Sequence, residues 1–378
     1  MKPVYLDYNA TTPLDPRVFE AMRPYYQTKV GNAGSRTHAY GQEAKNAVER
    51  ARAEIASSLG CEAREVVFTS GATESNNLVL LGLISHGMST SRKHVLATCI
   101  EHKSVLEPLD KLCALGFEVE LVPVTAGGYA EPDAVRHRLR RDTLLVTMMH
   151  ANNETGVLQP VTEVAGLLAD SGVLFHVDAA QTFGKQVDEL KRLDCDFMSI
   201  SGHKIYGPSG VGALIVRRRT SRRVPLTPIM YGGGQERGFR PGTLPVPLIV
   251  GLGAAAELAR KEYRERAANA ERLKRRLLMA VAAVDHRING DLARTQSHVV
   301  NISFPGVDSE ALMLALNSEI AISNGAACTS SGHAPSHVLR SMNLPDDQIA
   351  SAVRFSWGPG VSEVPSAALV EAVLRLRW

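Results

Sequence analysis

The sequence has few cysteines, and they do not occur in the patterns that bind zinc or form a disulfide framework. Five cysteines are scattered among 378 residues, and no two of them form a C-x-x-C pair. An odd number at such spacing argues against both kinds of site, and no metal site is expected. Four of them are interpreted as small buried residues in or beside helices and strands, namely Cys61, Cys99, Cys113 and Cys195.

Long apolar runs and a strong net charge are also lacking. No stretch of about 18 apolar residues could span a membrane, and the opening MKPVYLDYNATTPLDP lacks the basic and apolar parts of a secretory signal. We therefore expect a cytoplasmic protein. The net charge is only +3, so direct nucleic-acid binding is not expected. The basic run at 217–223 is interpreted as a surface loop, with a docking patch for an acidic partner as the alternative.

What the sequence does contain is an alternation of short apolar segments with helical ones. A chain of 378 residues exceeds one simple core, so a large domain with a smaller companion is expected. The alternation predicts an α/β domain with a mostly parallel sheet flanked by helices. Helices are predicted at 74–85, 104–115 and 161–169, and strands at Val66–Thr69, His94–Thr98, Glu118–Val122, Leu144–Met149, Leu174–Val177, Phe197–Ile200 and Val211–Val216.

The sequence changes character after residue 225. A Pro- and Gly-rich stretch leads into a long helix, predicted over about 248–284, which would bridge two domains. Beyond it, strands at 299–304 and 352–356 and helices at 309–317 and 336–341 predict a smaller α+β domain. We assign 12–258 to the large domain, and 1–11 together with 259–378 to the small one.

Polar residues follow five of the predicted strands. Ligands of open α/β sheets bind beyond the carboxyl ends of the strands, so these loops should form one site. The loops are Ser70–Glu74, Glu101–Lys103, His150–Glu154, Asp178–Gln181 and Ser201–Lys204.

Two of these loops carry a lysine and a carboxylate whose chemistry depends on their partners. Lys204 lies in a glycine-flanked loop beside His203, where burial could make its amine nucleophilic, although a lysine after a strand is usually at the surface. Asp178 ends an apolar strand. Its carboxylate suits a protonated pyridine nitrogen, and helix N-capping is the alternative.

The segment Ser70–Glu74 is interpreted as a phosphate cup. It passes from a strand through a glycine turn, past Ala72, into a helix, so backbone N–H groups, the Thr73 hydroxyl and the helix dipole can face an anion. Ser201 and His203 could complete the cup. The segment lacks the G-x-x-x-x-G-K-[ST] signature, which argues against nucleoside triphosphates.

Cys328 differs from the other cysteines in its surroundings. It lies in SNGAACTSSGH, a stretch too small and polar for a core, so we expect an exposed, reactive thiol there. Cys99, three residues before His102, could lie near the site without taking part.

Taken together, these segments resemble the NifS/IscS-type cysteine desulfurases, within the class V aminotransferase group and fold type I of the pyridoxal-phosphate (PLP) enzymes. The resemblance runs nearly end to end. It is carried by YLDYNATT (5–12), TSGATESN (69–76), EHK (101–103), 150–156, HVDAAQ (176–181), SGHKIYGP (201–208), 232–243 and ACTS (327–330).

The resemblance implies PLP as cofactor and a role for each matching residue. Lys204 would be the Schiff-base lysine, and Asp178 the partner of the pyridinium nitrogen. Gln181 would bond the phenolic oxygen, and His102 would stack on the ring and assist proton transfer. The phosphate would be held by Ala72, Thr73, Ser201 and His203, with Thr243 contributed across a homodimer interface.

The same resemblance implies L-cysteine as substrate. Asn153 and Arg354 would fix its carboxylate, and Cys328 would attack its sulfur, leaving L-alanine and a Cys328 persulfide for an acceptor protein. Housekeeping members carry a C-terminal extension that docks an iron–sulfur scaffold, whereas this sequence stops at Trp378. That favours a dedicated acceptor in tRNA thiolation or DNA phosphorothioation over general iron–sulfur assembly.

Two alternatives compete with this interpretation. Another class V PLP enzyme, acting on a different amino acid, would not need Cys328. A non-enzymatic sulfur carrier or nucleic-acid adaptor would not need Lys204, Asp178 and a phosphate cup together. Pro241 and Asn324 depart from the commonest family pattern, but neither departure removes a chemical group.

Overall fold

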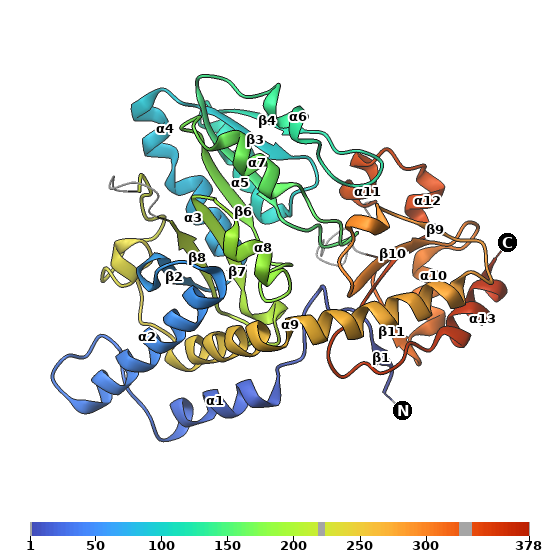
Figure 1. Ribbon diagram of the computed structural model, residues 1–378, viewed down its shortest axis with the longest axis horizontal. Coiled ribbons are helices and arrows are strands. Elements are labelled where there is room, and N and C mark those ends of the chain that lie inside the picture. Colours follow the sequence, from blue (N-terminus) through green and yellow to red (C-terminus); the bar gives the residue numbers. More distant parts are fainter. Residues whose placement is uncertain (1, 218–223, 325–334, 378) are drawn as a thin grey trace.

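A large sheet forms the centre of the computed structural model, which describes residues 2–217, 224–324 and 335–377 (Figure 1). Its seven strands lie in the order β2-β8-β7-β6-β5-β3-β4. They are β2 (Val66–Thr69), β3 (His94–Thr98), β4 (Glu118–Val122), β5 (Thr143–Met149), β6 (Leu174–Asp178), β7 (Phe197–Ser201) and β8 (Gly212–Val216). Only β8 runs against its neighbours, so β2 and β7 point the same way. The predicted mostly parallel α/β sheet is confirmed.

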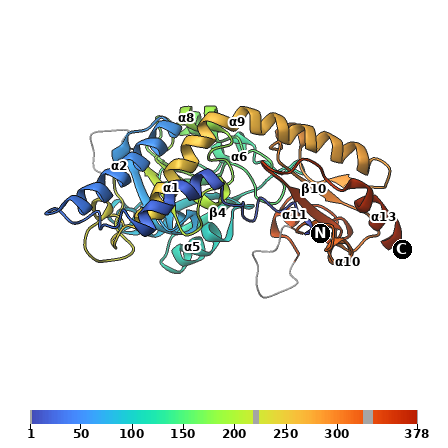
Figure 2. The ribbon, with the colours of Figure 1, turned by 90° about the horizontal axis from the view of Figure 1, so that it is seen from below.

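Helices cover both faces of this sheet, because successive strand residues point to opposite sides. In β2, Val66 and Phe68 pack into one core cluster and Val67 into another. The first cluster is covered by α1, α2, α7 and the N-terminal half of the long helix α9 (Val246–Val281), and the second by α3 and α5. Figure 2 shows α1, α2 and α9 on one side of the large part and α5 on the other. The helices of this part are α1 (Pro16–Gln27), α2 (Ala39–Leu59), α3 (Ala72–Gly82), α4 (Ile84–Thr90), α5 (Lys103–Ala114), α6 (Pro132–Arg136), α7 (Val161–Leu168) and α8 (Val187–Arg192).

One long helix joins the two parts of the molecule. α9 (Val246–Val281) has 36 residues and is therefore about 54 Å long at 1.5 Å per residue. Residues from Val246 to Ala256 belong to the core beside the large sheet, whereas those from Ala270 to Val281 belong to a separate core (Figures 1 and 2).

The second core lies in a smaller part built around a three-stranded antiparallel sheet. Trp357, Phe355 and Phe304 fill it, together with Leu6 from the N-terminal segment. Its strands are β10 (Val299–Ser303), β12 (Ala352–Ser356) and β9 (Arg287–Ile288), while β1 (Val4–Tyr5) pairs in parallel with β11 (Ile320–Ala321). Its helices are α10 (Ser309–Leu316), α11 (His337–Ser341), α12 (Asp346–Ala350) and α13 (Ser366–Leu376), and 3-10 turns occur at η1 (Ala63–Glu65), η2 (Gly202–Lys204), η3 (Glu236–Gly238) and η4 (Leu292–Arg294).

Two expectations need correction. The helix predicted at 74–85 is two helices, since α3 ends at Gly82 and α4 starts at Ile84. The four structural cysteines are not all buried: Cys195 is, Cys61 and Cys99 are half-buried, and Cys113 is exposed on the outer side of α5. Over the described ranges, no helix is both long and apolar enough to cross a membrane.

Candidate active site

A pocket of about 370 Å³ lies at the carboxyl ends of the large sheet's strands, where the polar loops were predicted to meet. Ten of the residues predicted for the site line it: Ala72, Thr73, His102, Asn153, Asp178, Gln181, Ser201, His203, Lys204 and Arg354. Thr243 does not line it and is exposed just before α9. Cys328 lies outside the described residues, as does most of the basic run at 217–223.

The loops come together because the strand between them carries a glycine where no side chain would fit. Gly212 of β8 pairs with both Thr69 and Ser201, the last residues of β2 and β7. A Cβ at Gly212 would lie 2.4 Å from the Ile200 carbonyl oxygen and 2.7 Å from the Gly71 Cα. The missing side chain therefore lets the turn at Gly71 approach β7 closely.

That turn and α3 form an anion cup. Gly71 is the N-cap of α3 and provides no side-chain cap, so the first N–H groups of the helix are available to a ligand. Ser201 and His203 line the same pocket, and Ser201 Oγ lies close to the Gly71 turn. Burial and the positive charges of Lys204 and Lys185 lower the pKa of His203 to about 4, so its ring is neutral at neutral pH.

Asp178 is buried at the end of β6 and is held by two donors. Its Oδ1 accepts from the Ala180 N–H at 2.9 Å, and its Oδ2 accepts from Asn76 Nδ2 at 2.8 Å. No helix starts behind it, since the following residues form turns, so the N-cap alternative is wrong. The carboxylate has no ion-pair partner in the part of the chain that the structure describes. It is positioned to bind a cationic group in the pocket.

A short relay connects Asp178 to His102. Asn76 Nδ2 also donates to Ser104 Oγ at 2.9 Å, and that hydroxyl lies 2.8 Å from His102 Nδ1. The Ser104 backbone N–H donates to the same ring nitrogen at 3.1 Å. Nδ1 is thus an acceptor, which leaves the proton of the neutral ring on Nε2. Burial lowers the pKa of His102 and so favours this neutral form.

Lys204 is covered by the N-terminal segment. Its Nζ donates to the Ala10 carbonyl at 2.7 Å and to the Asn9 carbonyl. Gln181 Nε2 donates to the same Asn9 carbonyl at 3.0 Å, while Gln181 Oε1 is buried without a partner among the described residues. An unpaired buried amide oxygen is costly, and a ligand hydroxyl in the pocket would satisfy it.

The small part contributes Arg354 of β12 to the pocket. Its guanidinium is 3% exposed, pairs with Asp7, and donates to the Asn153 carbonyl at 2.9 Å. Asn9 Nδ2 donates to the same carbonyl at 3.1 Å. A buried arginine facing a pocket is well suited to a substrate carboxylate.

Sequence reasoning missed several residues that position this site: Asp7, Asn9, Ala10, Asn76 and Ser104. The segment YLDYNATT had marked the N-terminal residues as part of a motif, but it gave no hint that their carbonyls would cover Lys204. For Asn76, the available signal was an amide in a helix whose buried positions, apart from Ser75, are apolar or glycine.

The fold and this pocket define a class of protein: an α/β protein whose site can hold an aromatic ring that bears a phosphate and a basic nitrogen. The α3 N-terminus suits the phosphate, the buried Asp178 suits the protonated nitrogen, and the unpaired Gln181 Oε1 suits the ring hydroxyl. Lys204 has its amine in the same pocket. These residues therefore fit PLP.

Comparisons with known proteins agree. The aminotransferase class-V family model matches residues 4–363. The chain is 46% identical over 366 residues to a protein named cysteine desulfurase IscS of Anaeromyxobacter dehalogenans (strain 2CP-C), covering 94% of this chain and 88% of that one. A solved NifS-like protein superposes with a TM-score of 0.89 at 35% identity, covering 100% of this chain and 98% of that one.

DndA from Streptomyces lividans superposes with a TM-score of 0.83 at 47% identity, covering 93% of this chain and 98% of that one. The chain belongs to the class-V aminotransferase family, and the family resemblance predicted from the sequence is confirmed.

Proposed function

We propose that this protein is a PLP-dependent cysteine desulfurase that converts L-cysteine into L-alanine and holds the sulfur on Cys328 as a persulfide. Relatives that are 44–46% identical over most of the chain bear the name cysteine desulfurase IscS, which supports the proposal. The structural support is the way in which the segment carrying Cys328 is anchored at the pocket.

Both ends of that segment are fixed beside the pocket. Before it, the Ser323 N–H and carbonyl pair with the backbone of Arg354 at 3.4 and 2.6 Å. After it, Ser336 Oγ donates to Glu154, next to Asn153. The described residues on both sides of the Cys328 segment are therefore held by residues that line or adjoin the pocket.

The residues of the pocket have separate roles in the proposed reaction. Lys204 and the cup at Ala72, Thr73, Ser201 and His203 would hold PLP, with Asp178 and Gln181 on its ring and His102 against its face. When bound, PLP supplies an electron sink for the bonds at the substrate's α-carbon. Arg354 and Asn153 bind the substrate carboxylate, and Lys204 Nζ accepts the proton from Cα. His102 holds its proton on Nε2, toward the pocket.

Transfer of the sulfur to Cys328 completes the reaction. The Cβ–S bond of L-cysteine breaks and an S–S bond forms on the Cys328 thiolate. The transferred sulfur is oxidised, and the carbon skeleton takes up the electron pair and a proton to become L-alanine. Free L-cysteine and a thiol thus become L-alanine and a persulfide, and no further oxidant or reductant is required.

The test follows alanine and sulfide from L-cysteine with the PLP-loaded protein. Cys328→Ser should bind PLP and L-cysteine yet release no sulfide in a reducing agent, whereas the matched variant Cys99→Ser should keep its activity. Lys204→Ala should form no alanine and should lose the absorbance band of the bound cofactor at roughly 420 nm. Undiminished sulfide release by Cys328→Ser would refute the role of Cys328.

We also propose a homodimer in which Thr243 reaches the phosphate of the neighbouring subunit. The exposure of Thr243, away from its own pocket, supports this arrangement. Mixing inactive Lys204→Ala protein with a crippled Thr243 variant should restore up to half of the sites in mixed dimers, because one site then carries neither defect. No recovery despite subunit exchange would place Thr243 outside the partner's site.

The domain boundaries and cellular role complete the proposal. We divide the chain into 12–258 and 1–11 with 259–378, which the separate cores along α9 support. We place the protein in the cytoplasm, passing sulfur to an acceptor protein of tRNA thiolation, DNA phosphorothioation or iron–sulfur assembly. A pull-down with the persulfide-loaded protein, followed by detection of the labelled sulfur, identifies the acceptor.

A further inference from the structure

A second cavity, of about 340 Å³, lies where both parts of the molecule meet α9. The large part contributes Lys185 and the residues after Lys204, α9 contributes its middle turns, and the small part contributes 296–298 and 357–359. It shares no residue with the candidate active site. We call it the α9 cavity, and the residues around it include Tyr206, Tyr263 and Trp357.

Buried polar atoms in its wall lack partners. Gln296 is 2% exposed, and neither its Nε2 nor its Oε1 has a hydrogen-bond partner among the described residues. His298, 8% exposed, has an unpaired Nε2. The backbone of Gln296 is fixed, because its carbonyl accepts from Lys274 Nζ at 3.0 Å and its N–H donates to the Gly156 carbonyl at 3.0 Å. Gln296 is therefore placed at the wall, and its amide has donor and acceptor capacity that no described residue uses.

The charge of the cavity is one-sided. Of the described residues that line it, three are cationic and none is Asp or Glu. Arg264 pairs with Asp188 at 3.2 Å and Arg266 with Glu262 at 2.7 Å. Neither of these two carboxylates lines the cavity. Lys185 has no ion pair within the described ranges. Burial, reinforced by the positive charge of Lys204, lowers the pKa of Lys185 to about 7, as expected of an amine without a counter-charge.

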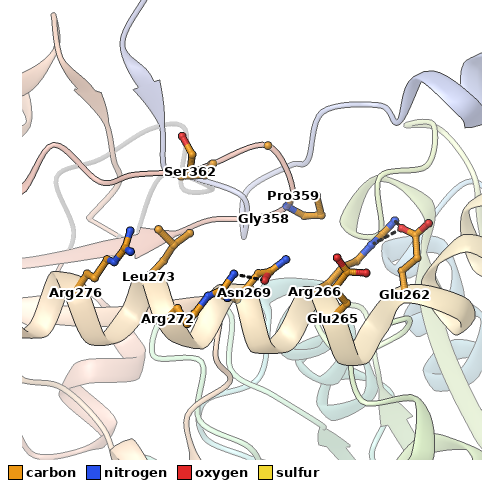
Figure 3. A pocket seen from close by; sticks show the side chains of 13 residues that line it. Glu262, Glu265, Arg266, Asn269, Arg272, Leu273, Arg276, Gly358, Pro359 and Ser362 are labelled. Atoms are coloured by element: carbon orange, nitrogen blue, oxygen red, sulfur yellow. Dashed lines mark hydrogen bonds and ion pairs between the residues drawn. The ribbon is translucent and has the colours of Figure 1, made fainter.

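A neighbouring groove on the same helix does not have this excess of positive charge. It shares Arg266, Ala270, Gly358 and Pro359 with the α9 cavity and continues along α9 toward Arg276 (Figure 3). Glu262 and Glu265 lie among its arginines, so its charge is mixed, and Arg272 is already bonded to Asn269 (Figure 3). The α9 cavity is the better-defined ligand site of the two.

We propose that the α9 cavity binds a small aromatic carboxylate, with its carboxylate on Lys185 and the unpaired Gln296 amide and its ring between Tyr206 and Tyr263. Trp357 is fully buried, and its Nε1 is satisfied by the Ala270 carbonyl at 3.1 Å, so it packs beneath the wall of the cavity. The ligand touches Ile205 and Tyr206, which directly follow Lys204, and so lies behind the catalytic lysine without entering its pocket.

The experiment is a calorimetric titration of the PLP-loaded protein with benzoate and with its neutral analogue benzamide. L-Alanine is present in excess to occupy the carboxylate-binding end of the active site. Benzoate should bind at least tenfold more tightly than benzamide, and Lys185→Met should weaken benzoate binding at least tenfold. Lys261→Met, an exposed lysine of α9 outside the lining, should leave it unchanged.

A second variant tests the cavity independently, in case Lys185→Met does not fold. Ala267→Phe, at an exposed position of α9 on the cavity wall, narrows the cavity without removing a charge and should also weaken benzoate binding. Thermal melting confirms that each variant is folded. Equal binding of benzoate and benzamide, or full benzoate affinity in folded Lys185→Met protein, would overturn the proposal.

Discussion

The two ends of the candidate active site are built in different ways. The cofactor end, which comprises Ala72, Thr73, Asp178, Ser201 and His203, comes from adjacent loops of one sheet. The substrate end comprises Asp7, Asn153 and Arg354, which belong to the N-terminal segment, the large part and the small part respectively. The cofactor end is fixed by strand pairing, whereas the substrate end exists only when separate parts of the chain are docked.

The two ends of the site should therefore respond differently to substitutions. At the cofactor end each side chain lies at the end of a buried strand or just beyond it, so a substitution there should change the chemistry without moving the scaffold. At the substrate end the residues hold one another through an ion pair and shared carbonyls. Substitutions there should change substrate affinity and leave PLP binding nearly intact.

The largest effect should come from Asp178→Asn. The amide can still accept from the Ala180 N–H, but the negative charge that would balance a protonated ring nitrogen is lost. We expect kcat for alanine formation to fall about 100-fold or more, equivalent to at least ~2.7 kcal/mol of barrier. Steady-state kinetics with saturating PLP measures it. Asp170→Asn, an exposed control, should be unaffected, and a kcat within about twofold of wild type would disprove the role of Asp178.

Arg354→Lys should affect the substrate end of the site. Lysine keeps the charge but loses the planar fork that can bind a carboxylate through two hydrogen bonds. We expect KM for L-cysteine to rise about tenfold, while the PLP dissociation constant changes less than about twofold. Kinetics and a PLP titration on the same protein separate the two quantities. An unchanged KM would mean that Arg354 does not bind the substrate carboxylate.

Asp7→Asn should give a smaller change in the opposite direction. Asp7 pairs with Arg354 and therefore competes with the substrate carboxylate for the guanidinium. Without that charge, KM for L-cysteine should fall about two- to fivefold, equivalent to ~0.4–1 kcal/mol of binding free energy. Asp285→Asn, a surface control, should not change KM. A rise in KM would show that Asp7 positions Arg354 rather than competing for it.

The smallest effect should come from Ser104→Ala. The Ser104 hydroxyl donates to His102 Nδ1 and stabilises the neutral ring, so its loss should raise the pKa of His102. Because the ring is then protonated at higher pH, the acid limb of the kcat profile should move to higher pH, with kcat at its optimum falling less than about twofold. Ser89→Ala, an exposed control, should keep the wild-type profile. An unshifted acid limb would exclude the relay through Ser104.

The sequence predicted the cofactor end better than the substrate end, for the same physical reason. Strands alternate visibly with helices, and the residue after each strand has a known place at the sheet edge, so Asp178, Ser201 and Lys204 could be brought together from sequence alone. Ion pairs and carbonyl contacts between distant segments leave no periodic signal. The pairing of Asp7 with Arg354 and the covering of Lys204 by Asn9 could not be inferred. The roles assigned to these residues, and to Cys328 and Thr243, remain predictions.

The pairing of the N-terminal segment with the small part also dictates when this pocket is completed during synthesis. Val4 pairs with Ile320, and Asp7 bridges to Ser356, more than 300 positions along the chain. Residues 9 and 10 leave the ribosome early, but their partners follow roughly 20–70 s later at 5–20 residues per second. Until then the N-terminal segment has only its anchor on the large part, where Thr12 is bonded to His203 and Tyr206. Docking of the last strands adds the second anchor of the segment that covers Lys204.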